Sequence, residues 1–335
     1  MIITRTPFRI SFFGGGTDYP AWFKEHGGAV LGTTINKYCY LSVRRLPPFF
    51  EHRHRVVYSK IELPNSIQEI QHPSVKAVLS EHWKDQDGLE VHHHADLPAR
   101  SGLGSSSSFT VGLLNAIGTL KGQIKSQRQL ALEAIRIEQD VIQEHVGSQD
   151  QVWAAYGGTN IIRFKRDGDF ECSPIIMPSS RHKELNSHMM LFFTGFSRIA
   201  SEIAAKKIEN MAHKEAHFRA LSDIVEEAVS ELQSKQANMK TIGQMLHASW
   251  ELKRNLADTV TNAHIDEIYE AGLSAGALGG KLLGAGGGGF MLFFVPPESH
   301  QKVRQKLANL VEVDFKIGSC GSKVVIYEPS GLENI

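Results

Sequence analysis

A short segment rich in serine and glycine constrains this chain most, because it stands between a predicted strand and a predicted helix. The segment is Ser101-Gly-Leu-Gly-Ser-Ser-Ser-Ser108. Leu89–Ala95, which precedes it, is typical of a strand. After the segment, apolar residues recur at intervals of three and four, which predicts a helix that begins near Ser105.

A glycine loop between a strand and a helix can bind phosphate. The first turn of a helix leaves N–H groups unpaired, and the helix dipole places about half a positive charge there. Glycines let the backbone approach phosphate oxygens, and serine hydroxyls add donors or a ligand for Mg²⁺. The alternative is that the serines only cap the helix. The segment is not a P-loop, because no lysine follows its glycines.

A second glycine run, Gly284–Gly289, matches the pattern G-x-G-x-x-G. A dinucleotide-binding fingerprint requires a strand before the glycines and a helix after them. Here a predicted helix comes first and the apolar strand Phe290–Val295 follows. The order of elements therefore argues against a nicotinamide-dependent oxidoreductase.

The bulk composition indicates a two-domain α+β protein. The chain has 335 residues, of which 41% are hydrophobic, and its formal net charge is zero. This length favours two domains, which we place at residues 1–175 and 176–335. Zero net charge gives no support for nucleic-acid or membrane binding. Three widely spaced cysteines and an N-terminus without an apolar run predict a cytoplasmic protein. A monomer and a homodimer both remain open.

Periodicity predicts the principal elements of both halves. The expected strands are Ile2–Thr4, Arg9–Phe13, Ala29–Val43 with a break near Asn36, Leu89–Ala95, Met189–Thr194, Phe290–Val295 and Lys323–Tyr327. The expected helices begin near Ser105, run from a capping box at Ser126 to Gly147, and span Phe218–Leu232, Met245–Leu256, Ile265–Ala277 and Ser299–Leu310.

Three motifs resemble those of the GHMP kinases, the superfamily of galactokinase, homoserine kinase and mevalonate kinase. They are Thr6-Pro-Phe-Arg-Ile-Ser-Phe-Phe-Gly-Gly-Gly-Thr-Asp-Tyr19, Pro98-Ala-Arg-Ser-Gly-Leu-Gly-Ser-Ser106 and Lys281-Leu-Leu-Gly-Ala-Gly-Gly-Gly-Gly289. The resemblance implies an N-terminal domain like ribosomal protein S5 domain 2, a ferredoxin-like C-terminal domain, and ATP with Mg²⁺. It also implies that the central motif holds the ATP phosphates, through Pro98, Ser101, Gly102, Leu103, Gly104, Ser105, Ser106 and Ser107.

The same resemblance assigns the chemistry to three further residues. Asp150 lies in Gly-Ser-Gln-Asp-Gln, which is similar to a galactokinase motif whose aspartate takes the proton of the attacking hydroxyl. Arg9 matches the basic residue of the first motif, which would hold Asp150 ionised. Glu138 and Ser106, with Ser105 or Ser107 as alternatives, would bind Mg²⁺. Without the family, Asp150 is read as a helix cap and Glu138 as a salt-bridge partner.

The first motif also bears on the substrate. Galactokinases carry Glu-His where this chain has Gly15-Gly16, which leaves room and free N–H groups for a larger or anionic sugar. The pattern resembles the branch of sugar 1-kinases that act on D-glycero-α-D-manno-heptose 7-phosphate, with the fucokinase kinase domain as a near relative. That branch phosphorylates the anomeric hydroxyl and leads to nucleotide-activated heptose for lipopolysaccharide or capsule.

A substrate that already carries a phosphate needs a second anion site. The predicted substrate-binding residues are Gly15, Gly16, Thr17, Asp18, Tyr19, Lys37, Arg198, Lys253, Gly286 and Gly287, with Arg254 as a further candidate for the second anion. The alternatives are a kinase for another sugar, such as L-fucose or galactose, and a sugar sensor of the same fold without catalysis.

Overall fold

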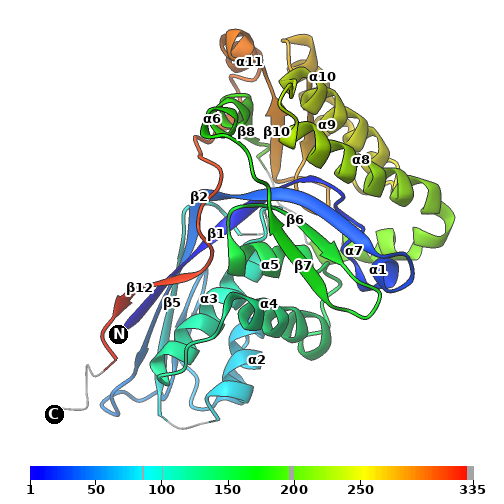
Figure 1. Ribbon diagram of the computed structural model, residues 1–335. Coiled ribbons are helices and arrows are strands. Elements are labelled where there is room, and N and C mark those ends of the chain that lie inside the picture. The colour runs from blue at the N-terminus through cyan, green and yellow to red at the C-terminus, as the bar shows by residue number, and fades with distance from the viewer. Residues whose placement is uncertain (85–86, 100, 196–199, 330–335) are drawn as a thin grey trace.

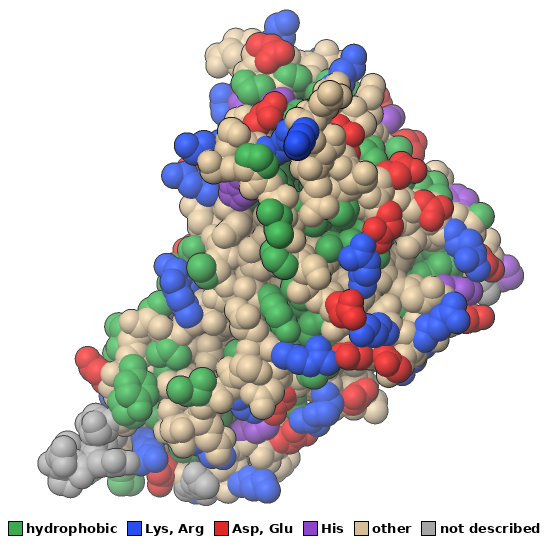
Figure 2. All heavy atoms as spheres, viewed as in Figure 1, with side chains coloured by type: hydrophobic (Ala, Val, Ile, Leu, Met, Phe, Trp, Pro, Cys, Tyr) green, Lys and Arg blue, Asp and Glu red, His purple; other side chains and the backbone are tan. Residues whose placement is uncertain are grey.

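A computed structural model describes residues 1–329, apart from residues 85–86, 100 and 196–199. Within these residues the chain forms one sheet of eight strands and one of four, with helices on both (Figure 1). The expected α+β class is confirmed. On the face drawn in Figure 2, basic and acidic side chains are intermingled, in keeping with the zero net charge.

The strand β2 (Gly28–Arg45) organises the large sheet. It pairs with β1 (Ile2–Phe13) along most of its length. Its first half also pairs with β6 (Thr159–Phe164), and its second half pairs with β5 (Leu89–Ala95). Valine, isoleucine and threonine are frequent in β2, and such β-branched residues fit a pleated, half-buried surface. One strand thus joins segments that are far apart in the sequence.

Both long strands are more continuous than the sequence predicts. The expected gap between Ile2–Thr4 and Arg9–Phe13 is wrong, because β1 is one strand. β2 also runs through Asn36 as one strand, but its pairing with β1 is interrupted there, since Pro7 pairs with Tyr38 and Arg9 with Thr34. Because proline has no N–H to donate to the ladder, an irregularity at this point lets the strand continue.

Helices cover the two faces of the large sheet (Figure 1). On one face lie α2 (Pro73–His82), α3 (Ser105–Leu120), α4 (Gln127–Arg136) and α5 (Gln149–Tyr156). On the other face, α8 (Glu215–Gln233) contacts β1, β2 and α9. The predicted helix Phe218–Leu232 is confirmed, and its apolar stripe is buried at Phe218, Leu221, Val225, Ala228 and Leu232.

The small sheet has the strand order β11-β8-β10-β9. Its strands are β8 (Met189–Phe193), β9 (Gly279–Leu282), β10 (Phe290–Phe294) and β11 (Val311–Glu312). Every residue of β10 is buried, as expected for an uninterrupted apolar strand. Helix α9 (Met239–Arg254) contacts β9, and α10 (Ala263–Ser274) contacts β9 and α11 (His300–Lys306).

After β11 the chain leaves the small sheet, and the last strand, β12 (Lys323–Tyr327), pairs with β1 in the large sheet. The end of the chain therefore returns to the N-terminal sheet.

The division of the chain into domains at residues 175 and 176 stays a prediction. In the described part of the chain, no helix is long and apolar enough to cross a membrane. The remaining elements are α1 (Pro20–His26), β3 (Arg55–Val57), β4 (Ile61–Glu62), η1 (Ile67–Glu69), β7 (Phe170–Pro174), α6 (Ser179–Ser187), α7 (Ala200–Glu209), η3 (Met211–Lys214) and η4 (Pro297–Ser299).

Helix α4 begins as predicted but ends early. The capping box between Ser126 and Gln129 is present. The predicted end at Gly147 is wrong, because the helix widens into a π-helical turn, η2 (Ile137–Val141), and the chain then turns away at Gln143, whose φ is 61°. π-Helical turns are rare in proteins, and those that occur are often found at functional sites. The residues that follow η2 are thereby free to run along the pocket described next.

Candidate active site

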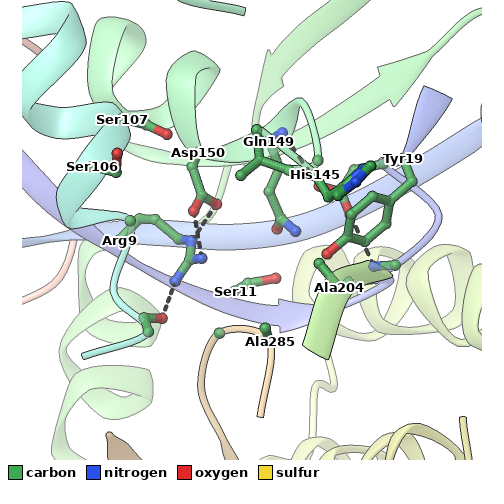
Figure 3. Close-up of a pocket in the computed structure, with 18 of the residues that line it drawn as sticks. Arg9, Ser11, Tyr19, Ser106, Ser107, His145, Gln149, Asp150, Ala204 and Ala285 are labelled. Carbon is green, nitrogen blue, oxygen red and sulfur yellow. Dashed lines mark hydrogen bonds and ion pairs between the residues drawn. The ribbon is translucent and has the colours of Figure 1, made fainter. Parts of the chain in front are cut away.

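A pocket of about 260 Å³ lies where β1, the start of α3, the segment before α5 and the C-terminal half meet. Figure 3 shows residues from these parts of the chain facing one another. The three predicted motifs all contribute to its lining, although they are far apart in the sequence. The lining residues are Arg9, Ser11, Gly15, Gly16, Asp18, Tyr19, Gly102, Gly104, Ser105, Ser106, Ser107, Glu144, His145, Val146, Gly147, Gln149, Asp150, Ala204, Lys253, Lys281, Gly284 and Ala285.

The serine-rich loop adopts the geometry expected of a phosphate-binding loop. Gly102 and Gly104 have φ angles of 83° and 75°, a left-handed conformation that favours glycine. Helix α3 begins at Ser105 with Gly104 as its N-cap, and among the described residues no side chain caps it. The first turn of α3 therefore presents backbone N–H groups and serine hydroxyls at the pocket.

Arg9 and Asp150 form a bidentate ion pair beside this loop (Figure 3). Nε of Arg9 donates to Oδ1 of Asp150 at 2.7 Å, and Nη2 donates to Oδ2 at 2.8 Å. Nη1 of Arg9 donates to the carbonyl oxygen of Gly102 at 2.6 Å. A Cβ at Gly104 would lie 3.3 Å from Oδ2 of Asp150. One guanidinium therefore joins the carboxylate to the loop.

Glu138 lies behind the pocket wall in the π-helical turn η2. Its side chain is fully buried, and its Oε2 accepts hydrogen bonds from Oγ of Ser107 at 2.8 Å and Nε2 of Gln151 at 2.5 Å. Its Oε1 has no hydrogen-bond partner among the described residues. Burial raises the pKa of Glu138 to about 7, since the hydrogen bonds from neutral groups offset it only in part.

This environment fits a hard cation. Carboxylate and hydroxyl oxygens are the ligands that Mg²⁺ prefers. A bound cation would also neutralise the negative charge of the buried Glu138 carboxylate. The hydroxyl that contacts Glu138 is that of Ser107, one of the stated alternatives to Ser106. Ser107 also lines the pocket, so it connects Glu138 to the serine-rich loop.

A further part of the pocket lining surrounds Asp18, which is almost fully buried. The backbone N–H of Gly16 donates to its Oδ1 at 2.8 Å, and that of Gln149 to its Oδ2 at 3.4 Å. The free N–H expected at Gly16 is therefore engaged within the protein. Burial is the largest effect on Asp18 and raises its pKa. A Cβ at Gly147 would lie 1.9 Å from Oδ2 of Asp18, so only glycine allows this approach.

Several predicted residues lie outside the pocket lining. Thr17 is buried and donates from its hydroxyl to the carbonyl oxygens of Gly14 and Ala29, so its contacts fix the turn. Arg254 is paired with Asp266 at 2.8 Å. Arg198 falls outside the described residues. The other predicted residues that the described lining omits are Pro98, Ser101, Leu103, Glu138, Lys37, Gly286 and Gly287.

Two lysines of the C-terminal half reach the pocket. Nζ of Lys253 donates to the carbonyl oxygens of Leu282 and Gly284 at 2.8 and 2.7 Å. Nζ of Lys281 donates to the carbonyl oxygen of Phe12 at 2.6 Å. Lys253 is a predicted site residue, whereas Lys281 was predicted only as part of a motif. Both side chains are buried, so their positive charges lie in the wall of the pocket.

Other lining residues were not predicted from the sequence. Ser11 lies two positions after Arg9, and alternate residues of a strand share a face, so its position could have been predicted. Gln149 precedes Asp150 directly. Glu144 and His145 could not have been placed, because the expected helix through Gly147 would have carried them elsewhere.

Comparisons with known proteins identify the family. The GHMP kinases N terminal domain matches residues 71–158, and the GHMP kinases C terminal domain matches residues 228–312. A D-glycero-alpha-D-manno-heptose 7-phosphate kinase from Campylobacter jejuni is 28% identical over 88% of this chain and 90% of its own length. A bifunctional fucokinase/GDP-fucose pyrophosphorylase from Arabidopsis thaliana is 25% identical over 93% of this chain but 31% of its own length.

Solved structures share the fold. A D-glycero-D-manno-heptose 1-phosphate kinase from Bacteriodes thetaiotaomicron has a TM-score of 0.76 at 23% identity, covering 98% of this chain and 100% of the other. The galactokinase of Lactococcus lactis complexed with galactose has a TM-score of 0.72 at 18% identity, covering 96% and 94%. The chain therefore belongs to the GHMP kinases, with the two-domain α+β fold predicted from its motifs, and it is a phosphotransferase that uses an alcohol group as acceptor.

Proposed function

We propose that this protein transfers a phosphoryl group from ATP to the anomeric hydroxyl of D-glycero-α-D-manno-heptose 7-phosphate. The product would be the 1,7-bisphosphate, an intermediate on the way to nucleotide-activated heptose. The heptose 7-phosphate kinase that matches most of both chains supports this substrate. The Arg9–Asp150 pair carries the proposal, because it places a carboxylate beside the phosphate-binding loop.

The ion pair supports a role for Asp150 as general base. One oxygen of Asp150 would accept the proton of the sugar hydroxyl while the hydroxyl oxygen forms its bond to the γ-phosphorus of ATP. The bond between that phosphorus and the leaving ADP breaks in the same step. Arg9 holds the carboxylate in place through two hydrogen bonds. Its third bond, to Gly102, links the base to the nucleotide loop, so both reactants would be aligned by one side chain.

The start of α3 is proposed to hold the ATP phosphates. Gly102, Gly104 and Ser105–Ser107 line the pocket there. Pro98, Ser101 and Leu103 would act through the shape of the loop. For example, the carbonyl oxygen of Leu103 accepts from the Arg9 backbone N–H at 3.0 Å. Glu138, with Ser107 or Ser106, would hold Mg²⁺, whose chemical contribution is to neutralise charge on the phosphates.

The sugar is proposed to occupy the part of the pocket lined by Gly15, Asp18 and Tyr19. In Figure 3, Tyr19 lies on the far side of Asp150 from Ser106 and Ser107. The phosphate on the sugar needs a cationic partner. Lys253 and Lys281 place buried ammonium groups in the pocket wall, where hydrogen bonds to backbone carbonyl oxygens fix their positions. We therefore propose Lys253, together with Lys281, as the partner of the substrate phosphate.

The test is ADP release with ATP, Mg²⁺ and a panel of heptose 7-phosphate, unphosphorylated heptose, mannose, L-fucose and galactose. The expected result is turnover of heptose 7-phosphate far above the others. Turnover of L-fucose but not of heptose 7-phosphate would overturn the substrate and favour the fucokinase alternative. Saturable sugar binding without ADP release for every sugar would favour a sensor.

A further inference from the structure

Three consecutive glycines, Gly14, Gly15 and Gly16, pass along the pocket, and the structure requires only two of them. Gly14 has a φ of 79°, and a Cβ there would lie 2.0 Å from the carbonyl oxygen of Ala29. Gly16 has a φ of 116°, and a Cβ would lie 3.0 Å from the ring of Phe218. Neither position can take a side chain without strain. These two glycines are explained by the backbone and by packing.

Gly15 differs from its neighbours. Its φ lies outside the left-handed region, and the atoms nearest to an added Cβ would be at ordinary contact distances. A Cβ at Gly15 would lie 3.5 Å from Oγ of Ser11 and 3.8 Å from Nε2 of Gln149. A side chain would fit, but it would fill the space between these two polar groups. The absence of a side chain at Gly15 therefore keeps that space open.

The two groups that face this space have unmet hydrogen-bonding capacity. Among the described residues, Oγ of Ser11 and Oε1 of Gln149 are buried without a hydrogen-bond partner. Buried polar atoms are normally paired, and exceptions call for an explanation. Both residues line the pocket. A ligand group bound between them would supply the missing partners.

The position of the space relates it to the reacting pair. Ser11 follows Arg9 by two residues, and the β1–β2 register is regular between them, so both side chains lie on one face of β1. Gln149 directly precedes Asp150. Figure 3 shows Ser11 and the Gln149 amide between the Arg9–Asp150 pair and Tyr19. A ligand group in this space would thus be next to the one that faces Asp150.

The chemistry of the space favours a hydroxyl group. A serine hydroxyl and a glutamine amide are neutral, and both can donate and accept hydrogen bonds, as a sugar hydroxyl can. The carboxylate of Asp18, which accepts from the Gln149 backbone N–H, lies close by and would repel an anion. The substrate phosphate therefore belongs elsewhere in the pocket.

We propose that Ser11 and Gln149 bind the sugar hydroxyl vicinal to the reacting one, in a subsite that Gly15 keeps open. For a kinase acting on an anomeric hydroxyl, the vicinal group is the 2-hydroxyl. The subsite rests on the proposed function, because it requires a sugar whose reacting hydroxyl faces Asp150. It makes Ser11 and Gln149 specificity-determining residues of the reaction.

The experiment compares heptose 7-phosphate with its 2-deoxy analogue by measuring kcat/KM for both. In the wild-type enzyme we expect kcat/KM for the 2-deoxy analogue to be lower by about tenfold or more, because the analogue leaves the polar atoms of the subsite unpaired. In the double variant Ser11→Ala, Gln149→Ala this loss in kcat/KM should shrink to about twofold, since the groups that hydrogen-bond the 2-hydroxyl are absent. The KM for ATP should stay unchanged.

A second variant guards against misfolding of the first. Gly15→Ala keeps both polar groups and fills the space, so it should raise the KM for heptose 7-phosphate while the KM for ATP stays constant. The matched control is Ser187→Ala, Gln233→Ala, at exposed sites outside the pocket lining, which should keep the full 2-deoxy penalty.

The outcomes separate the two proposals. An unchanged 2-deoxy penalty in the Ser11→Ala, Gln149→Ala variant, or no penalty in the wild type, would overturn the subsite alone. If the wild-type enzyme turns over another sugar instead, the same comparison is made with that sugar and its analogue lacking the vicinal hydroxyl. If it turns over no sugar, the proposed function is wrong and the subsite falls with it.

Discussion

Glu133 and Glu138 lie on the same helical segment, yet their surroundings shift their pKa values in opposite directions. Glu133, on α4, contacts Nε2 of His82 at 2.8 Å and is paired with Lys125. Burial alone would raise the pKa of Glu133, but hydrogen bonds from these two residues outweigh it and lower the pKa to about 2. The fold itself supplies a cation, Lys125, for this carboxylate.

Glu138, on the π-helical turn η2, accepts hydrogen bonds from neutral donors such as Ser107 and Gln151. Burial therefore prevails and raises its pKa to about 7. Asp150, like Glu133, has a cationic partner within the protein, because it forms an ion pair with Arg9. The difference distinguishes carboxylates that the fold has already neutralised from one whose environment favours an added cation.

The largest expected effect is at Asp150, the carboxylate that Arg9 joins to the serine-rich loop. Asp150→Asn should lower kcat by about 10²- to 10⁴-fold, because the amide cannot take the proton of the sugar hydroxyl. Nucleotide affinity should be retained, which calorimetry with ADP would check. Asp140→Asn, at an exposed position of η2, is the matched control and should turn over normally. Near-normal turnover by Asp150→Asn would remove Asp150 from the chemistry.

The cation of Asp150 can be exchanged without removing its charge. Arg9→Lys keeps the positive charge but lacks the planar guanidinium, whose three separate nitrogens donate to both oxygens of Asp150 and to Gly102. We expect kcat to fall by about 10- to 100-fold. Arg163→Lys is the control, because Arg163 makes a similar contact to Glu226 on the surface. Equal kcat for Arg9→Lys and wild type would show that a nearby charge is sufficient.

At Glu138 the comparison predicts a metal phenotype. Glu138→Gln should raise the Mg²⁺ concentration for half-maximal activity by about tenfold or more, because a neutral amide is a poorer ligand. Without metal at pH 8, the variant should be no less stable to urea than the wild type, since it no longer buries a charge. An unchanged Mg²⁺ requirement would contradict the assignment of Glu138 to the metal.

The smallest effect is expected at Glu133. Its pKa of about 2 in the folded protein lies below the usual value of about 4.3 in an unfolded chain. Ionised Glu133 therefore stabilises the fold above about pH 4.3, and this stabilisation is lost as the pH falls towards 2. Allowing for solvent screening, Glu133→Gln should lower the free energy of unfolding by about 1 kcal/mol at pH 7.

Urea denaturation of the Glu133→Gln variant and the wild type at pH 7 and pH 3 would measure this difference. The loss should be smaller at pH 3, and the Mg²⁺ requirement should match that of the wild type. A loss that stays constant with pH would show that packing, and not charge, accounts for the contribution of Glu133. A changed Mg²⁺ requirement would break the distinction between the two glutamates.

The sequence was sufficient where the pattern is local or directly recognisable. The strand–loop–helix around Gly102 and Gly104, the capping box at Ser126 and the buried strand β10 follow from turn chemistry and periodicity. The three motifs predicted the family and the two-domain fold, which the comparisons confirm. The end of α4 could not be predicted, because a π-helical turn has no distinct sequence pattern.

The sequence by itself determined the loop, its helix and the motifs that supply the candidate catalytic residues, because these depend on neighbours along the chain. Only the tertiary structure decided which of them meet. It pairs Arg9 with Asp150, turns Ser107 towards Glu138, and distinguishes Gly15 from two glycines with the same sequence surroundings. The physical reason is that burial, charge pairing and steric clash depend on atoms brought together from distant parts of the chain.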